Sequence, residues 1–429
     1  NHEVFKQKEW PKALRDISVL SPYYDMVARQ LSLSVTPYDQ VPKVRARRLA
    51  AENISLEPNF YDRSNISVMY DYRYLDDQLK NPQGMIQRPC TLCGDCITGC
   101  NVGAKNTLMM NYLPIAKHNG VEMYTQCEVD SIEKKEGYYS IKLIYFDHSE
   151  KTGETTRHHL KINTKMVVVG AGSPGSASIL LNSQSEQFRF SPALGYNWSG
   201  NGDTIGFVVK MPGPTNIGGF GAYDTNCNRT GVGPTVQSSL NYYGNQELHR
   251  RLLIQDAAIP RGMTKLFTYL MGDRDLNNSM VMLGMGHDGG HGRIIKRDGR
   301  YQIKWPGLKE SNYRKMVFGE FERLAAAHGG QYKRLKAFGY NLVTVHPLGG
   351  CGMSDDPGFG TTNHLGQVFD GTNECIAGNP AVHHGLYVAD GSVMPTALGV
   401  NPYMSIGAVS ERIANHIVNN PIHSDLFER

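Results

Sequence analysis

The sequence contains no hydrophobic run that approaches the ~18 consecutive apolar residues of a membrane-spanning helix. Residues 1–20 have neither the basic start nor the apolar core of a secretory signal peptide. The net charge is only +4 over 429 residues, and aromatic side chains do not alternate with basic ones, which argues against a nucleic-acid partner. These absences predict a protein without a transmembrane segment. They leave the compartment unknown but favour the cytoplasm over secretion.

Cysteine is scarce for a chain of this length, so the sequence does not describe a disulfide scaffold. Four of the eight cysteines nevertheless lie close together, at Cys90, Cys93, Cys96 and Cys100. Their C-x2-C-x2-C-x3-C spacing is that of an iron–sulfur ligand run, although Asn101 replaces the usual following proline. Structural zinc sites more often divide their cysteines into two separated pairs. Two interpretations stay open: an iron–sulfur cluster that passes electrons to a protein relay, or a reduced cysteine patch that stabilises a loop.

Polar residues follow a short, apolar strand pattern near the end of the chain. The predicted strand, residues 386–389, is followed by Asp390 and Gly391, and a loop with Asn401 then leads into a predicted helix. His346 lies on an earlier loop, in a His-Pro-Leu-Gly-Gly-Cys segment. Ligands of open α/β sheets bind at the carboxyl ends of strands and against helix N-termini. An imidazole accepts protons and a carboxamide both donates and accepts hydrogen bonds, so these residues predict a site for a hydroxyl group.

A glycine-rich turn follows the apolar run of residues 167–169. Gly170, Ala171 and Gly172 begin a G-x-G-x-x-G pattern that leads into a predicted helix. A complete dinucleotide-binding unit continues to a second strand, with an acidic residue about 20 residues further on. Residues 188–203 are instead rich in Gly, Asn, Ser and Pro. We therefore predict a secondary cofactor contact at this turn, with an independent NAD site as the weaker alternative.

The remaining pattern predicts two β-rich regions. Short apolar runs separated by glycine and charged residues predict a meander over residues 123–169, and similar runs over residues 206–304 predict an antiparallel sheet. Residues 311–328 have the periodicity of an amphipathic helix. His383 and His384 have no acidic or cysteine partner at metal-ligand spacing, so we predict that they are surface loop residues.

In their order along the chain, these motifs resemble the glucose–methanol–choline (GMC) FAD-dependent oxidoreductases, and within them the cholesterol-oxidase-like branch. A lone loop histidine would fit a turn-capping role, but the acidic, glycine, asparagine and proline residues that follow in family order favour a catalytic one. The resemblance implies that His346 and Asn401 hold the substrate alcohol against the flavin. It also implies a set of cofactor contacts: Val129, Gly170, Ala171, Gly172, Asp390, Gly391, Asn401, Pro402 and Met404.

One position departs from the cholesterol-oxidase-like pattern. Those members use a glutamate from the substrate lobe as a base, and the matching residue here is Gln255. A glutamine side chain cannot take a proton. Either Asp256 or His346 then acts as the base, or the register is shifted by one residue, or activity is impaired.

The resemblance implies an α/β fold built from two lobes. One is a discontinuous, N-terminally truncated, Rossmann-like FAD lobe, and the other is a substrate lobe with helices and a mostly antiparallel sheet. The family opens with a strand, a glycine-rich turn and a helix that hold the flavin pyrophosphate, and this unit does not occur in the sequence. We expect roughly the first hundred residues of the family pattern to be missing. The predicted division assigns the substrate lobe residues 1–104 and 196–377, and the FAD lobe residues 105–195 and 378–429.

The expected reaction is the FAD-dependent oxidation of an alcohol to a ketone, with hydride passing to flavin N5. A 3β-hydroxy sterol or another hydrophobic secondary alcohol is the expected substrate, and oxygen or another electron acceptor completes the cycle. The gap in the family pattern leaves two alternatives. One is a flavin-free remnant or binding protein of the same fold, and the other is an iron–sulfur electron-transfer flavoprotein.

Overall fold

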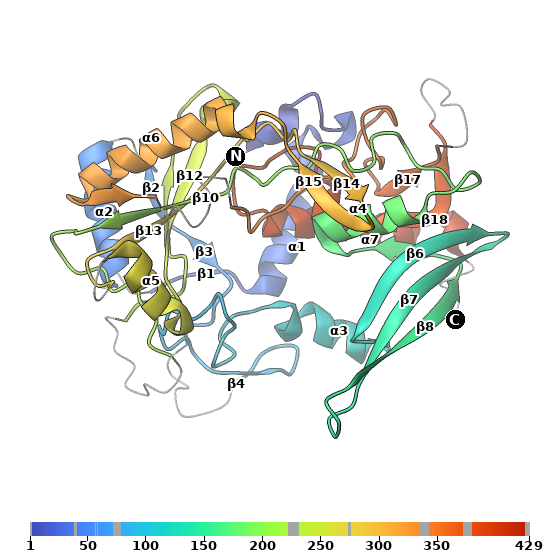
Figure 1. Ribbon diagram of the computed structural model, residues 1–429, viewed down its shortest axis with the longest axis horizontal. Helices are drawn as coiled ribbons and strands as arrows, with labels where there is room; N and C mark the ends of the chain where they lie inside the picture. Colours follow the sequence, from blue (N-terminus) through green and yellow to red (C-terminus); the bar gives the residue numbers. More distant parts are fainter. Residues whose placement is uncertain are drawn as a thin grey trace.

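The computed structural model describes residues 2–37, 41–55, 57, 59–71, 79–221, 231–272, 276–334, 343–371 and 380–424, and it forms two adjacent lobes (Figure 1). In this part of the chain there are seven α-helices: α1 (Ser21–Leu31), α2 (Pro42–Ile54), α3 (Tyr112–His118), α4 (Gly172–Ser183), α5 (Thr264–Met271), α6 (Asn312–Ala327) and α7 (Tyr403–Asn419). None of the helices in these ranges has the length and apolar character needed to cross a membrane.

A six-stranded antiparallel sheet forms the centre of the first lobe. Its order is β16 (Gln331–Lys333), β10 (Thr204–Val209), β13 (Met280–Gly286), β12 (Leu252–Ala257), β11 (Ser238–Asn241) and β2 (Tyr61–Arg63). Because side chains alternate along a strand, the sheet has two apolar faces. Ile254 and Met282 pack toward α2 and α6, whereas Phe207 and Val281 pack toward Met271 of α5. The sheet is therefore covered by helices on both sides.

The second lobe contains a smaller sheet of β17 (Gln367–Phe369), β18 (Val382–Val388) and β9 (Val167–Val169). β18 and β9 run parallel, with Leu386 opposite Val167, although about half of the chain separates them. Trp10, Leu180 of α4 and Ile413 of α7 belong to the core around this sheet. Residues from both ends of the chain thus share one hydrophobic core, which places the carboxyl ends of two distant strands side by side.

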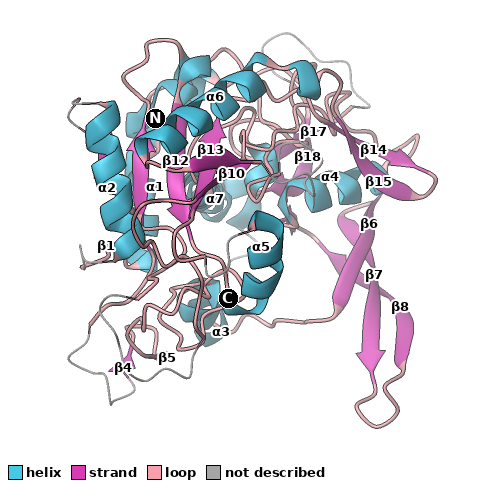
Figure 2. Cartoon of the chain, turned by 60° about the vertical axis from the view of Figure 1, so that its left-hand side comes forward, coloured by secondary structure: helices cyan, strands magenta, loops and turns pink. Residues whose placement is uncertain are grey.

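A three-stranded antiparallel sheet extends away from the second lobe (Figure 2). It consists of β6 (Cys127–Lys135), β7 (Tyr138–His148) and β8 (Thr155–Thr164). The Ile132 amide of β6 donates to the Ser183 hydroxyl at the end of α4 at 2.8 Å. The remaining strands form short antiparallel pairs: β14 (Arg293–Arg297) with β15 (Arg300–Lys304), β1 (Ser34–Val35) with β3 (Asn65–Ile66), and β4 (Leu79–Lys80) with β5 (Ile86–Gln87).

The predicted α/β class and the mostly antiparallel sheet are confirmed. The helix predicted over residues 311–328 is α6. Ser311 caps its N-terminus, since its side chain accepts a hydrogen bond from the Arg314 amide. The surface-loop prediction for His383 is wrong. This residue lies within β18, its side chain is buried, and its Nε2 lies 2.8 Å from the Arg189 carbonyl oxygen. The four-segment division stays a prediction, and its boundary at residues 377/378 lies outside the described residues.

Candidate active site

Asp390 lies where β18 ends, beside the carboxyl end of the parallel strand β9. One of its carboxylate oxygens accepts hydrogen bonds from the Gly172 amide at 2.9 Å and from the Ser176 hydroxyl. The other accepts from the amide and the hydroxyl of Ser392 at 2.8 and 2.5 Å. The carboxylate therefore joins the end of β18 to the first turn of α4, where the sequence predicted a cofactor-contacting glycine turn.

The glycine turn has open space beside it. A Cβ atom built on Gly170 or Gly172 would meet no atom within 4 Å, and Gly172 has φ +77°. Ala171 precedes the first turn of α4, and the neighbouring Val168 side chain is 48% exposed. The amides of Ala171 and Gly172 are already paired with Ser176 and Asp390, so it is the backbone without obstructing side chains that fits the close approach of a dinucleotide such as FAD.

This turn does not belong to a complete NAD-binding unit in the described part of the chain. α4 is followed by a loop, and the next strand, β10, belongs to the sheet of the other lobe. Among the described strands, only β9 and β18 pair in parallel. The G-x-G-x-x-G pattern therefore marks the start of α4, and its role as a secondary FAD contact stays a prediction.

His346 is held by a buried carboxylate from the other lobe. Its Nδ1 lies 2.9 Å from a carboxylate oxygen of Asp203, whose side chain is fully buried. The amide of Val345 also donates to Asp203, at 2.8 Å. A carboxylate can only accept, so Nδ1 of His346 donates the proton of this hydrogen bond, and in the tautomer with the proton on Nδ1 the Nε2 atom keeps a lone pair. With 17% of its side chain exposed, His346 can present this nitrogen to a small molecule.

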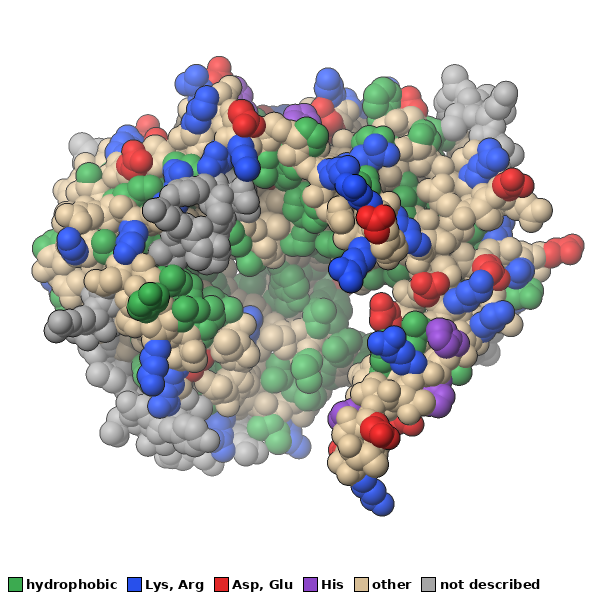
Figure 3. All heavy atoms as spheres, in the orientation of Figure 1, with side chains coloured by type: hydrophobic (Ala, Val, Ile, Leu, Met, Phe, Trp, Pro, Cys, Tyr) green, Lys and Arg blue, Asp and Glu red, His purple; other side chains and the backbone are tan. Residues whose placement is uncertain are grey.

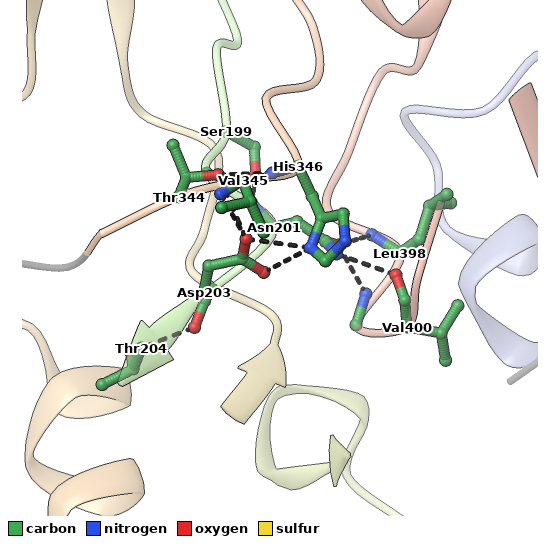
Figure 4. A network of polar contacts seen from close by, with 12 residues as sticks. Ser199, Asn201, Asp203, Thr204, Thr344, Val345, His346, Leu398 and Val400 are labelled. Carbon is green, nitrogen blue, oxygen red and sulfur yellow. Dashed lines mark hydrogen bonds and ion pairs between the residues drawn. The ribbon is translucent and has the colours of Figure 1, made fainter. Parts of the chain in front are cut away.

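The loop before Asn401 is held by Asn201. The Asn201 side-chain oxygen accepts from the amides of Leu398 and Gly399, both at 2.9 Å, and its nitrogen donates to the Val400 carbonyl at 2.8 Å. Figure 4 shows the His346 ring between Asp203 and this Leu398–Val400 loop. Residues 199–203, which we call the bridging segment, therefore contact both the His346 loop and the Asn401 loop.

Asp288 holds the bridging segment in place through hydrogen bonds. Its carboxylate accepts from the Ser199 hydroxyl at 2.8 Å and from the amides of Gly200 and Gly202 at 3.0 and 2.9 Å. Burial raises the pKa of Asp288, and these hydrogen bonds oppose that shift. Ser199 also exchanges two backbone hydrogen bonds with Leu348, both at 2.9 Å. The segment is thus fixed independently of any ligand.

The bridging residues are not apparent from sequence patterns, because the composition of residues 188–203 indicates only a segment that is not a strand. The signal for them in the sequence is a run of small polar residues that ends in an aspartate, just before the apolar run of β10. Such side chains commonly hydrogen-bond backbone groups of neighbouring loops. The loop partners of the Asn201 and Asp203 side chains lie 141 to 199 residues further along the chain, and local pattern does not identify them.

Three other predicted residues lie near the start of α7. Asn401 is exposed, Pro402 is buried at the N-cap position, and Met404 is half-buried in the first turn. Gly391 is buried between this helix and the His346 loop: a Cβ built on it would lie 3.0 Å from the Ile406 side chain and 3.4 Å from the carbonyl oxygen of Pro347, the residue after His346. A larger residue at position 391 would push α7 and the His346 loop apart.

Gln255 and Asp256 point to opposite faces of the first lobe's sheet, since they are adjacent on β12. Gln255 is buried on the α5 side, and its side-chain oxygen has no hydrogen-bond partner among the described residues. Asp256 is fully buried on the other side and pairs with Lys43 of α2. Burial raises the pKa of Asp256, but the charge and hydrogen bond of Lys43 outweigh this and lower it overall. Asp256 therefore serves the packing of the lobe, which leaves His346 as the candidate base.

His287 is a further residue beside this site, and no sequence motif marks it. It follows β13, and a Cβ built on Gly399, which has φ +67°, would lie 2.9 Å from its Nε2. Burial lowers the pKa of His287 to about 4, so the ring is neutral at physiological pH. A neutral imidazole against Gly399 supports the same turn that Asn201 holds.

Val129 and the four cysteines lie away from the bridging segment in sequence and on separate elements. Val129 lies on β6 and is 36% exposed, next to an irregularity in the pairing with β7. Cys90 and Cys93 are buried, and Cys96 and Cys100 are half-buried. Within the described residues, no group of three or more His, Cys, Asp or Glu side chains is arranged to hold a single metal ion.

Two family models, both described as GMC oxidoreductase, match this chain. The N-terminal model matches residues 85–198 and the C-terminal model matches residues 291–410. Together they cover more than half of the chain, so the chain belongs to the GMC oxidoreductase family. The resemblance seen in the motifs is confirmed, and FAD is the cofactor that this family implies.

The chain is similar to two curated cholesterol oxidases. The protein from Mycobacterium tuberculosis is 26% identical over 372 residues, which cover 77% of this chain and 59% of that protein. The protein from Acinetobacter baumannii is 24% identical over 381 residues, with coverage of 80% and 63%. The chain thus spans about three fifths of the length of these relatives.

Among solved structures, pyridoxine 4-oxidase from Mesorbium loti superposes with a TM-score of 0.55 at 12% identity. The alignment covers 90% of this chain and 72% of that chain. At this identity the likeness concerns the fold, which is that of a GMC oxidoreductase.

Proposed function

We propose that this chain, with FAD bound, oxidises an alcohol to the corresponding carbonyl compound. The observation that carries the proposal is that the bridging segment contacts both the loop of His346 and the loop that leads to Asn401, near the ends of β9 and β18. FAD supplies the hydride acceptor, flavin N5, when it is bound. The residues that would hold it are the predicted contacts: Val129, Gly170, Ala171, Gly172, Asp390, Gly391, Asn401, Pro402 and Met404.

The protein's own part of the reaction is to orient the alcohol and take its proton. Nε2 of His346 accepts the hydroxyl proton, because Nδ1 is already committed to Asp203. The buried carboxylate of Asp203 then stabilises the imidazolium that forms. Asn401 holds the hydroxyl oxygen without changing the charge of the site. Gln255 supplies no proton acceptor, so this chain relies on His346 where other members use a glutamate.

We propose a hydrophobic secondary alcohol, with a 3β-hydroxy sterol as the leading candidate. The support is the similarity to two cholesterol oxidases and the hollow between the lobes, whose visible floor in Figure 3 is mostly hydrophobic. Burial of apolar substrate surface against apolar side chains favours binding by roughly 25 cal/mol for each Å² removed from water. Oxygen is the proposed electron acceptor, since the relatives are oxidases.

The test begins with the absorbance spectrum of the purified chain after incubation with FAD and removal of the free cofactor. Anaerobic addition of cholesterol should bleach the flavin band, and a short primary alcohol should bleach it far more slowly. Admission of oxygen should restore the band and form hydrogen peroxide. Bound flavin that no alcohol reduces would refute the proposal.

A flavin-free binding role is the second candidate. Dinucleotide-binding lobes are built on sheets of several parallel strands, whereas in the described part of the chain only the strands β9 and β18 pair in parallel. This candidate predicts a protein that retains no FAD after gel filtration but still binds a sterol. Titration with a fluorescent sterol would detect such binding. Retention of about one FAD per chain would refute it.

A further inference from the structure

The cysteine loop, residues 90–100, folds so that all four of its cysteines line one small cavity. The rest of the wall is mainly small or apolar and includes Val68, Val102 and Ala104. Lys105 is the one cationic side chain among the described residues that line it. A cavity with four thiols and one cation is suited to an anionic group bound through sulfur.

Each of the four sulfurs accepts a hydrogen bond from a nitrogen: Cys90 from the Leu92 amide at 3.4 Å, Cys100 from the Lys105 amide at 3.4 Å, Cys93 from the Asn101 carboxamide at 4.0 Å, and Cys96 from the Thr235 amide. Hydrogen bonds to sulfur are one of the means by which proteins stabilise iron–sulfur clusters and set their potentials. A patch of ordinary reduced thiols does not require one donor for every sulfur.

The loop is fixed to the first lobe on several sides. The Cys93 carbonyl accepts from the Phe220 amide at 3.0 Å, and the Asp95 carboxylate accepts from the Arg261 amide at 2.7 Å. Gly94, with φ +81°, lies so close to Val232 that a Cβ would come within 2.7 Å of its side chain. These contacts hold the cysteines around the cavity before any ligand arrives.

We propose that Cys90, Cys93, Cys96 and Cys100 bind one four-iron iron–sulfur cluster. In a cubane cluster each cysteine binds a different iron, so the four thiols surround the cluster and do not converge on one point. Zinc needs all four sulfurs at about 2.3 Å from a single ion, and no group of three or more potential ligands among the described residues is arranged in that way.

The arrangement also differs from that of two-cluster ferredoxins. There, the fourth cysteine of such a run binds the other cluster and is followed by proline. Here Cys100 lines the same cavity as the other three, and Asn101 follows it and donates to Cys93. The replacement of proline thus provides a hydrogen-bond donor to the site. This inference does not depend on the proposed alcohol oxidation.

The test is a metal analysis of the whole chain, purified without oxygen and reconstituted with ferrous iron and sulfide. We expect about four iron and four sulfide per chain, and a paramagnetic signal after reduction by dithionite. Replacement of each of the four cysteines by serine should remove most of the iron and the signal. Cys127→Ser is the matched control, since this cysteine is exposed on β6, and its iron content should equal that of the unmodified chain.

A chain that binds zinc in place of iron, or that keeps four free thiols after reconstitution, would overturn the proposal. Serine variants that hold as much iron as the unmodified chain would do the same. Asn101→Ala gives a test that does not require loss of the cluster. It should keep the iron but lower the reduction potential, because the hydrogen bond from Asn101 to Cys93 favours the more negative reduced state. An unchanged potential would contradict the assignment of this contact.

Discussion

Nδ1 of His346 lies 2.9 Å from the carboxylate of Asp203, a residue 143 positions earlier in the chain. The contact crosses from the start of β10 in the sheet of the first lobe to a loop beside α7 in the second. It fixes the orientation of the ring and directs Nε2 away from Asp203. The orientation of the proposed base is thus set by a residue that does not itself meet the substrate.

The Asp203→Asn variant should lower turnover on the order of 10²–10⁴-fold, the range seen when the partner of a catalytic histidine loses its charge. An asparagine can donate to Nδ1, which would favour the tautomer with the proton on Nε2. Flavin content and the midpoint of thermal unfolding should change little. Anaerobic flavin bleaching in a stopped-flow instrument measures the effect, with Asp298→Asn, an exposed carboxylate, as the control.

His346→Ala and Asn401→Ala should each remove flavin bleaching while leaving any bound flavin in place. The expected reduction in rate is on the order of 10²–10⁴-fold for His346, because it removes the proton acceptor. The rates are compared with those of His158→Ala, which changes an exposed histidine on β8. If both active-site variants turn over at the normal rate, the assignment of these two residues fails.

Asn201→Gly should impair turnover by releasing the loop before Asn401. Asn201 has φ +57°, so glycine keeps the backbone conformation and removes only the side chain with its three hydrogen bonds. Each buried group left unpaired costs about 1–3 kcal/mol. Asn197→Gly is a matched control, since Asn197 has φ +55° but its side chain makes only a long, exposed contact at 3.5 Å. Equal activity in the two variants would exclude the role of Asn201.

Lys43→Met should destabilise the first lobe by about 3–5 kcal/mol, because it leaves the fully buried Asp256 carboxylate without its partner. The double variant Lys43→Met/Asp256→Leu should recover much of this loss, since it removes both charges. Urea unfolding monitored by circular dichroism measures the free energies. A double variant as unstable as the single one would show that the polar contacts of Asp256 with Ser238 matter more than its charge.

The Lys43–Asp256 ion pair also predicts how the free energy of unfolding depends on pH in the acidic range. The pKa of Asp256 is lowered in the folded protein, so its contribution is fully present above the unfolded-state pKa of about 3.9 and is lost as the pH falls through the folded-state pKa. The difference in unfolding free energy between the unmodified chain and Asp256→Asn should therefore shrink as the pH falls below about 4. A difference that stays constant down to the acid transition would contradict this.

Strong local patterns predicted many elements of the fold. The periodicity of residues 311–328 predicted α6, and the short apolar runs after residue 123 predicted the meander that became β6, β7 and β8. His383 shows where such patterns fail. Its buried position depends on β18 lying between β17 and β9, and that neighbourhood is formed by segments far away in sequence.

The sequence by itself determined the family, the α/β class and the candidate pair His346 and Asn401, because each depends on short motifs in a characteristic order. Only the tertiary structure brought Asp203 to His346 and Asn201 to the loop before Asn401. It also gathered the four clustered cysteines around one cavity. Local sequence specifies local geometry, whereas hydrogen bonds between distant loops depend on how two lobes pack, and no single segment encodes that packing.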